Sequence, residues 1–428
     1  MGDRDVPDAI DARSGWRYIG LAAAACLPAI LLRTSIFHIS VGVDTLLFGV
    51  AILGAAFLLS WGAEVAQMDI SQALAIAFLA FIAVLPEYAV DLVFAWKAGN
   101  EDRILHDTGT FANICKGEHP CRQLAIANMT GANRLLIGLG WAVVVLLWWR
   151  RSGERAVKLG DRSRTDLGFL LIATLWAFTI VIREHISILD MVVLLAIFVA
   201  YVWHAAVEEA EEPELMGPPL AVAALPTRKR RQFTVLMFLF AAGVILASAE
   251  PFAEGLVQTG RILKIDEFLL VQWLAPLASE APEMIIAILF VLRARPQNGL
   301  GTLVSSKVNQ WSLLIATIPL VYAIARHGLV AMPLDSKQVE EVFLTAAQSA
   351  FAVGVLANLS IGRGEAVMLL IPFLGQFAFP STSVRFGFAG FYLAGLAYLV
   401  VRHGEARAGL RAAVGAALSA PKRASPKD

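Results

Sequence analysis

The chain has 428 residues, of which 58% are hydrophobic and 16% charged, and its mean hydropathy is +0.67. Its 35 basic residues balance its 35 acidic residues. In a membrane protein the placement of charge matters more than its total. The composition therefore indicates a polytopic membrane protein and gives no support to nucleic-acid binding.

Crossing the hydrocarbon core of a bilayer takes roughly 17 to 25 apolar residues. Twelve segments of the sequence meet this requirement and predict an all-α membrane protein. The first has a polar lead and no clear Ala-x-Ala cleavage site, so we interpret it as a retained helix rather than a signal peptide. The predicted spans are 17–37, 42–62, 71–96, 123–149, 166–182, 187–205, 233–255, 267–293, 300–325, 341–361, 365–381 and 384–402.

The distribution of basic residues gives an orientation to these spans. With a cytoplasmic N-terminus, 22 of the 35 Lys and Arg residues fall on cytoplasmic segments, ten on the opposite side and three in or beside spans. Basic residues favour the cytoplasmic side of a membrane. We therefore expect a multi-pass protein of the cell (inner) membrane with both termini in the cytoplasm.

A polar connection over residues 206–232 divides the chain into two halves. It changes from a glutamate run, Glu208 to Glu214, to the basic run Arg228 to Arg231. A regulatory cation site among the glutamates is one interpretation, but Ca²⁺ loops also supply turn glycines and regularly spaced ligands. A solvated charge run is therefore favoured for this cytoplasmic linker.

Two cysteines lie in the loop 97–122, which the charge count places outside. Cys115 and Cys121 flank the sequence KGEHP. An oxidising compartment permits a disulfide between them, whereas a metal site formed with His119 or His106 would lack a recognised ligand spacing. We favour the disulfide and keep the metal site as the alternative.

The most informative motif is a Pro-Glu pair that occurs twice inside apolar segments. Glu87 follows Leu85-Pro86, and Glu283 follows Ala281-Pro282. An ionisable group within a bilayer is costly and usually marks an ion or proton pathway. Each proline also frees a backbone carbonyl that can turn toward a cavity.

The sequences around the two pairs align as a repeat. Residues 81–97 are followed by 125–141, and residues 277–293 by 299–315. Glu87 and Asn133 are 46 residues apart while Glu283 and Lys307 are 24 apart, and the cysteine-containing loop accounts for the 22 extra residues. The two spans cross the membrane in opposite directions in the predicted topology. Such an inverted repeat is typical of alternating-access transporters whose site lies at mid-membrane.

On these motifs the chain resembles the calcium/cation antiporter superfamily, which includes the sodium/calcium exchangers. The resemblance rests on residues 82–87 with 127–133 and on residues 278–283 with 301–307. It implies two inverted repeats of about five helices each, with one extra helix at each end and cation ligands on both motif helices. The implied organisation is 1–40 N-terminus and extra helix, 41–205 first repeat with its motif at 81–145, 206–232 linker, 233–382 second repeat with its motif at 277–318, and 383–428 extra helix and basic cytoplasmic tail.

This sequence departs from the family pattern at several expected ligands. The pattern places hydroxyl residues at Ala83 and Val84, an Asn at Lys307, and Asn or Asp at Leu136 and Gln310. Because Ca²⁺ prefers six to eight oxygen ligands, the loss of these oxygens leaves the transported ion open.

Two additional acids compensate for the missing oxygens. Asp91 lies four residues after Glu87, and Glu280 three residues before Glu283, so each pair shares a helix face. Clustered carboxylates favour proton coupling. Lys307 has two interpretations, a coupling residue or an internal counter-ion to Glu280, and Arg134 either contributes to this balance or snorkels to the interface. The candidate cation ligands are Glu87 and Glu283 as the principal pair, with Asp91, Glu280, Asn128, Asn133, Ser279, Thr302, Ser306 and Gln310.

We interpret the chain as a secondary active cation antiporter driven by Na⁺ or H⁺. Its partners are the lipid bilayer and inorganic cations such as Ca²⁺, Na⁺ or H⁺, and we expect no cofactor. The alternatives are a Na⁺/H⁺ antiporter that uses Lys307 in place of a Ca²⁺ site, and a membrane scaffold that does not transport. An enzyme is disfavoured because no His-Glu-x-x-His or Gly-x-Ser-x-Gly stretch occurs. The oligomeric state stays open.

Overall fold

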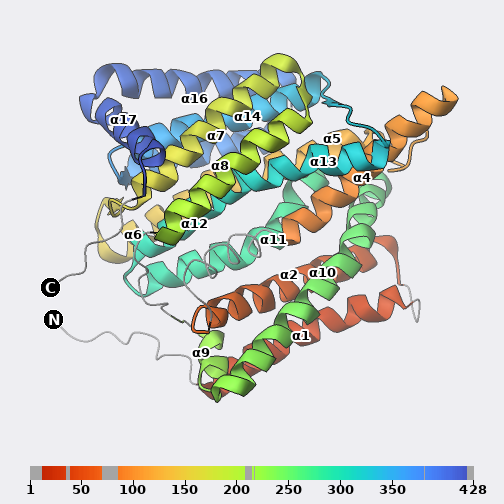
Figure 1. Ribbon diagram of the computed structural model, residues 1–428, viewed down its shortest axis with the longest axis horizontal. Helices are drawn as coiled ribbons and strands as arrows, with labels where there is room; N and C mark the ends of the chain where they lie inside the picture. The colour runs from red at the N-terminus through yellow and green to blue at the C-terminus, as the bar shows by residue number, and fades with distance from the viewer. Residues whose placement is uncertain are drawn as a thin grey trace.

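The computed structural model describes residues 12–34, 39–69, 85–207, 215, 217–379 and 381–421. These residues form long helices that run side by side, with a few very short strands between them (Figure 1). In the first half the helices are α1 (Ala12–Arg33), α2 (Val41–Ala66), α4 (Leu85–Thr108), α5 (Cys121–Leu135), the π-helix η1 (Leu136–Trp141), α6 (Ala142–Ser152), α7 (Ser163–Arg183) and α8 (Ile188–Val207). The linker holds α9 (Pro218–Ala223), and the second half holds α10 (Thr227–Leu263), α11 (Glu267–Leu292), α12 (Pro296–Asn309), the π-helix η2 (Gln310–Leu314), α13 (Ile315–Arg326), α14 (Ser336–Leu356), α15 (Arg363–Ala378), α16 (Thr382–Arg402) and α17 (Gly404–Leu418).

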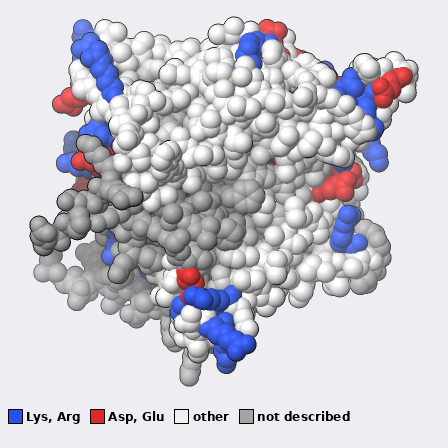
Figure 2. Space-filling model, in the orientation of Figure 1, with Lys and Arg blue, Asp and Glu red and all other residues white. Residues whose placement is uncertain are grey.

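The helices agree with a multi-pass membrane protein. Among the described residues, 10 helices are long and apolar enough to cross a bilayer, and they coincide with ten of the twelve predicted spans. The other two predicted spans correspond to α4, which carries many polar residues, and to α15, which has 16 residues. Residues 71–84 of the predicted span 71–96 lie outside the described part of the chain. Figure 2 shows a broad uncharged surface with Lys, Arg, Asp and Glu side chains at its margins, as lipid contact requires.

Two helices extend beyond their predicted bounds because polar contacts hold their ends. Helix α4 continues to Thr108, well past residue 96. Helix α10 begins at Thr227 within the predicted linker, where Arg230 and Arg231 pair with Asp69 at 2.8 and 3.0 Å. The length of an apolar run locates a membrane span, but it does not predict how far the helix continues into water beyond the span.

The two halves repeat the same series of elements. Helices α2, α4, α5–η1–α6, α7 and α8 correspond to α10, α11, α12–η2–α13, α14 and α15. Asp266, just before α11, contacts His119 in the loop after α4, at 3.0 Å. Because α4 ends on the side where α11 begins, the two helices cross the bilayer in opposite directions. The repeat is therefore inverted, with α1 before it and α16 after it.

Short strands join the halves on both sides of the membrane. Strand β1 (Ala156–Lys158) pairs antiparallel with β4 (Ser360–Gly362), and β2 (His185–Ile186) pairs antiparallel with β3 (Met332–Pro333). Strands β1 and β3 occupy equivalent places in the repeat, as do β2 and β4. Each pair thus combines one strand from each half, which ties the repeats together at both ends. We call the side of β2 and β3 the loop side and the side of β1, β4 and α9 the linker side.

The loop between α4 and α5 is anchored by acids of two helices. Cys115 and Cys121 form a disulfide with a Cα–Cα distance of 5.6 Å, and Glu101 of α4 accepts the backbone N–H of Cys121 at 2.9 Å. Glu267 of α11 accepts the N–H groups of Glu118 and His119. The loop is thereby attached to the first turn of α11, a helix that carries predicted site residues.

A titratable contact completes this attachment. His119 Nε2 lies 3.0 Å from Asp266 Oδ1, and this hydrogen bond raises the pKa of His119. Burial opposes ionisation of Asp266, but the bond from His119 and the charge of Lys337 outweigh it and lower the Asp266 pKa to about 2. With a raised folded pKa, the contribution of His119 is complete below the pKa of an unfolded histidine and is lost as pH rises through the folded value.

We therefore expect the loop to detach more often as pH rises from about 6 to 8. Hydrogen exchange of the segment 114–120, corrected for its intrinsic pH dependence, should accelerate over this range in the wild type. His119→Gln keeps a polar side chain but cannot titrate, so its corrected exchange should not vary with pH. Equal pH responses of the two proteins would contradict this role of His119.

Candidate functional site

The predicted acids lie on α4 and α11 beside the two prolines. Pro86 is in the first turn of α4, whereas Pro282 interrupts α11 and leaves one carbonyl without its helical donor. Glu87 is 1% exposed, and Asp91 and Glu280 are fully buried. Glu283 is partly buried. Both halves of the repeat therefore supply carboxylates to the protein interior.

Glu87 is the acid that connects this group. Its carboxyl interacts with the side chains of Ser279 and Glu280 on α11. It is also close enough to interact electrostatically with Asp91 and Glu283. The four predicted acids thus form one cluster across the α4–α11 interface, which we call the carboxylate cluster.

Side-chain amides hold two members of the carboxylate cluster. Asn128 of α5 donates to Asp91 Oδ1 at 2.8 Å, and Gln310 at the start of η2 donates to Glu280. Six buried oxygens of these residues have no hydrogen-bond partner among the described residues. Such oxygens are what a bound cation or added protons would satisfy. They are Glu87 Oε2, Asp91 Oδ2, Glu280 Oε2, Glu283 Oε2, Asn128 Oδ1 and Gln310 Oε1.

Lys307 adds a positive charge beside the cluster. It is fully buried on α12, and its Nζ donates to Asn133 Oδ1 at 2.7 Å and to the Asn133 carbonyl at 3.3 Å. The ammonium also lies 4.2 Å from the centre of the Trp311 ring and interacts electrostatically with Glu280. The oxygen of Asn133 is therefore engaged by Lys307 in this structure, which leaves the neighbouring amides as the open oxygens.

Both motif helices contain a π-helical turn at the same point of the repeat. The turn η1 starts at Leu136 and η2 at Gln310, each three residues after the aligned pair Asn133 and Lys307. A π-turn shifts the residues that follow it around the helix axis, and such turns are frequent at functional sites. Here η2 begins with the glutamine that holds Glu280.

Two predicted ligands lie apart from these contacts. Thr302 donates to the Asn298 carbonyl of its own helix at 2.9 Å. Ser306 is buried, and neither hydroxyl makes a hydrogen bond to the carboxylate cluster in the described part of the chain. Serine and threonine on membrane helices commonly bond to their own backbone.

Arg134 does not snorkel to the interface. It is fully buried, pairs with Glu341 of α14, donates to Gln376 of α15 at 2.9 Å and lies 5.1 Å from the Trp273 ring centre. Of the two interpretations of Arg134, snorkelling is therefore wrong, and the sequence could not decide between them because the partner glutamate is more than 200 residues away. Glu341 itself had no motif to mark it.

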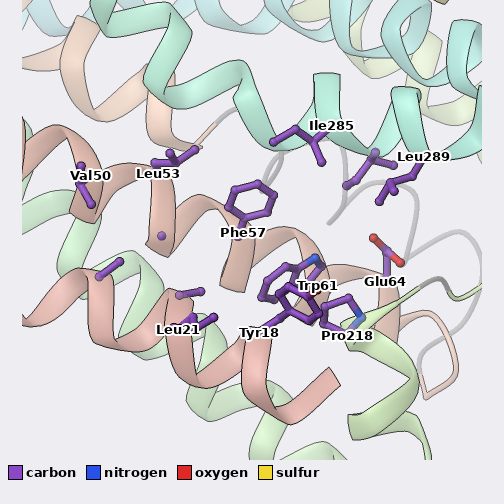
Figure 3. Close-up of a pocket in the computed structure, with 14 residues that line it drawn as sticks. Tyr18, Leu21, Val50, Leu53, Phe57, Trp61, Glu64, Pro218, Ile285 and Leu289 are labelled. Carbon is purple, nitrogen blue, oxygen red and sulfur yellow. The ribbon is translucent and has the colours of Figure 1, made fainter. Parts of the chain in front are cut away.

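A separate cavity of about 490 Å³ lies between α1, α2, α9 and α11. Figure 3 shows Phe57 and Trp61 of α2 in it, facing Ile285 and Leu289 of α11, with the Glu64 carboxyl at one end. The four acids of the carboxylate cluster are not among the described residues that line it. This mainly apolar cavity is therefore separate from the carboxylate cluster.

Fold and site together define a class of protein, an inverted-repeat membrane transporter with acids where the repeats meet. Comparison with known proteins gives the family. The profile described as sodium/calcium exchanger protein matches residues 42–207 and 233–381. The chain therefore belongs to the sodium/calcium exchanger family, whose members are transporters rather than enzymes.

Solved structures agree with this assignment. The crystal structure of the H⁺/Ca²⁺ exchanger CAX is 41% identical, covers 95% of this chain and 98% of its own, and has a TM-score of 0.87. The sodium–calcium exchanger NCX_Mj (16% identity, 79% and 98% coverage, TM-score 0.51) and the Ca²⁺/H⁺ antiporter YfkE (12%, 89% and 99%, 0.58) share the fold. A search of curated proteins found no match.

The Lys307–Asn133 contact predicts a stability effect. Asn133→Leu leaves a buried ammonium without its side-chain acceptor, which costs roughly 1.5–3 kcal/mol for a hydrogen bond to a charged group. We expect a lower melting temperature for Asn133→Leu in detergent and little loss for Asn133→Asp, which retains an acceptor. Thr302→Val on the partner helix is the control. A melting temperature for Asn133→Leu equal to that of the control would argue against the contact.

Proposed function

We propose that the protein exchanges Ca²⁺ for protons across the membrane, with the carboxylate cluster as the shared binding site. The observation that carries this proposal is the set of six unpartnered buried oxygens on residues from both repeats. Their number and chemistry suit Ca²⁺, which takes six to eight oxygen ligands. Carboxylates that lose the cation can take up protons instead, because like-charged buried acids resist ionising together.

Charge balance supports a divalent cargo despite Lys307. If all four acids ionise, one negative charge is offset by the lysine and three remain for Ca²⁺ and a proton. The 41% identity to the H⁺/Ca²⁺ exchanger CAX favours the proton as driving ion. Lys307 also supports a second candidate, exchange of a monovalent cation for protons, because a resident ammonium lowers the demand for a divalent ion.

Ion pairs on the loop side support alternating access. Lys97, in the middle of α4 and on the loop side of Glu87, pairs with Glu254 of α10 and lies 3.8 Å from Glu250. Arg33 of α1 lies 3.9 Å from the same Glu250. The Lys97 pairs link α10 to α4 and the Arg33 pair links α1 to α10, while the cavity of about 490 Å³ lies between α1, α2, α9 and α11 nearer the linker side. We infer that α1, α2 and α10 move relative to the site helices. The basic residues at the linker side favour a cytoplasmic location for it and for both termini.

Ion flux in proteoliposomes tests the function. We expect Ca²⁺ uptake by the wild type when a proton gradient is imposed, and at least a hundredfold loss for Glu283→Gln because a principal ligand charge is removed. Lys307→Asn should alter the preference among Ca²⁺, Na⁺ and K⁺. Asp161→Asn is the matched control, since its carboxylate is on the surface beside Arg164.

Three outcomes of this assay separate the alternatives. Uptake under a Na⁺ gradient alone would identify Na⁺ as the driving ion. Proton-coupled movement of Na⁺ or K⁺ without Ca²⁺ would favour the second candidate. If folded protein moves none of these ions under either gradient, exchange of these cations is refuted, and a different substrate or a scaffold role becomes the leading explanation.

The ion pairs of Lys97 predict that its substitution changes the apparent Ca²⁺ affinity on one side of the membrane. Lys97→Met should weaken loop-side closure by about 1 kcal/mol, the upper range for a partly exposed pair. The apparent Ca²⁺ affinity from the linker side should then fall up to about fivefold, because fewer molecules are in the competent state. The test is to measure the KM for Ca²⁺ of the wild type and of Lys97→Met in vesicles that expose either the linker side or the loop side. Arg103→Met is the control, because Arg103 bonds to Asn100 within α4.

A further inference from the structure

One carboxylate outside the carboxylate cluster joins three helices. Glu341 of α14 is fully buried, and its Oε2 accepts from Arg134 of α5 and, at 2.8 Å, from Gln272 of α11. Its Oε1 pairs with Arg385 of α16. Four helices therefore meet at a single side chain.

Two of these helices carry the proposed ion site. Arg134 directly follows Asn133, the residue that holds Lys307. Gln272 lies two turns before Glu280 on α11, so it is on the same helix face. The contact with Glu341 therefore fixes the rotation of α5 and α11 close to the residues that bear the ligands.

The third partner comes from outside the repeat. Arg385 lies in the first turn of α16, is 1% exposed, and approaches Glu340 at 3.7 Å as well as Glu341. Two arginines thus balance two glutamates in a buried and neutral group. Removing water from such charges offsets most of their attraction. The group therefore adds little net stability, and its directional contacts instead specify one arrangement of the helices.

We propose that Glu341 is a positioning residue for the ion site, holding α5 and α11 at the separation that cation binding requires. This inference rests on the proposed function. It assigns the extra helix α16 a part in transport, because Arg385 neutralises Glu341 and keeps its carboxylate oriented toward Arg134 and Gln272. Glu341 itself touches none of the four acids of the carboxylate cluster, so its influence on the cation is exerted through the two helices.

The adjacent glutamate provides a matched control. Glu340 is 1% exposed and lies 3.7 Å from Arg385 of α16; it interacts electrostatically with Arg134 but, among the described residues, forms no ion pair or hydrogen bond with α5 or α11. Glu340→Gln and Glu341→Gln remove the same charge from the same turn of α14. Only the second removes a link between the helices that carry ligands.

The experiment measures Ca²⁺ uptake against Ca²⁺ concentration in proteoliposomes for the wild type and both variants, after size-exclusion and melting checks. We expect Glu341→Gln to raise the KM at least tenfold with a smaller change in maximal rate, and Glu340→Gln to change the KM less than twofold. If Glu341→Gln does not fold, Gln272→Leu removes the α11 link alone, and its KM should rise at least threefold.

Each result has a distinct meaning. A folded Glu341→Gln, or a folded Gln272→Leu if that variant is needed, with wild-type KM overturns the positioning role. Equal KM increases in the Glu340 and Glu341 variants also overturn it, because the effect would then be one of charge alone. A wild type that moves no Ca²⁺ refutes the proposed function, and the inference falls with it.

Discussion

The structure depends on the cost of holding ionised side chains inside a membrane protein. A charged group removed from water needs partners that restore several kcal/mol of lost hydration. The described interior meets this cost in two ways. Glu341 forms ion pairs with two arginines, Arg134 and Arg385, whereas the four acids of the carboxylate cluster form no ion pair within the described part of the chain. A carboxylate that is ion-paired, such as Glu341, fixes the arrangement of the helices that it joins. A carboxylate without an ion-pair partner is available to a cation or a proton.

The inverted repeat explains how the acids come together. A Pro-Glu pair at equivalent points of two antiparallel helices brings Glu87 and Glu283 into one site without any long loop. The equivalent π-turns η1 and η2 show that the repeat extends to backbone detail. The aligned positions of Asn133 and Lys307 differ in charge, yet they bond to each other. A substitution that looked like a lost ligand is therefore one half of a contact between the repeats.

The sequence predicted the parts of the fold that depend on local pattern. Apolar run length located the spans, and the Pro-Glu pairs identified Glu87 and Glu283 as acids that meet. The group around Glu341 could not be predicted, because its members come from α5, α11, α14 and α16 and share no motif. Nor could the contacts of Thr302, since a hydroxyl on a membrane helix bonds equally well to its own backbone. Pairing between distant segments is set by tertiary packing, which periodicity does not encode.

The two additional acids, Asp91 and Glu280, do not follow the symmetry of the inverted repeat, because both are displaced toward the same side of the membrane. Asp91 follows Glu87 on a helix that runs toward the loop side, and Glu280 precedes Glu283 on a helix that runs away from it. Both extra carboxylates therefore lie on the loop side of the Pro-Glu pair. Each is held by an amide from the following helix, Asn128 or Gln310, at positions that the repeat does not relate. An arrangement required by helix packing alone would follow the repeat and place one acid on each side. Under the proposed function, the shared direction makes the loop side of the site the more acidic one, where a cation and protons would compete for the same oxygens.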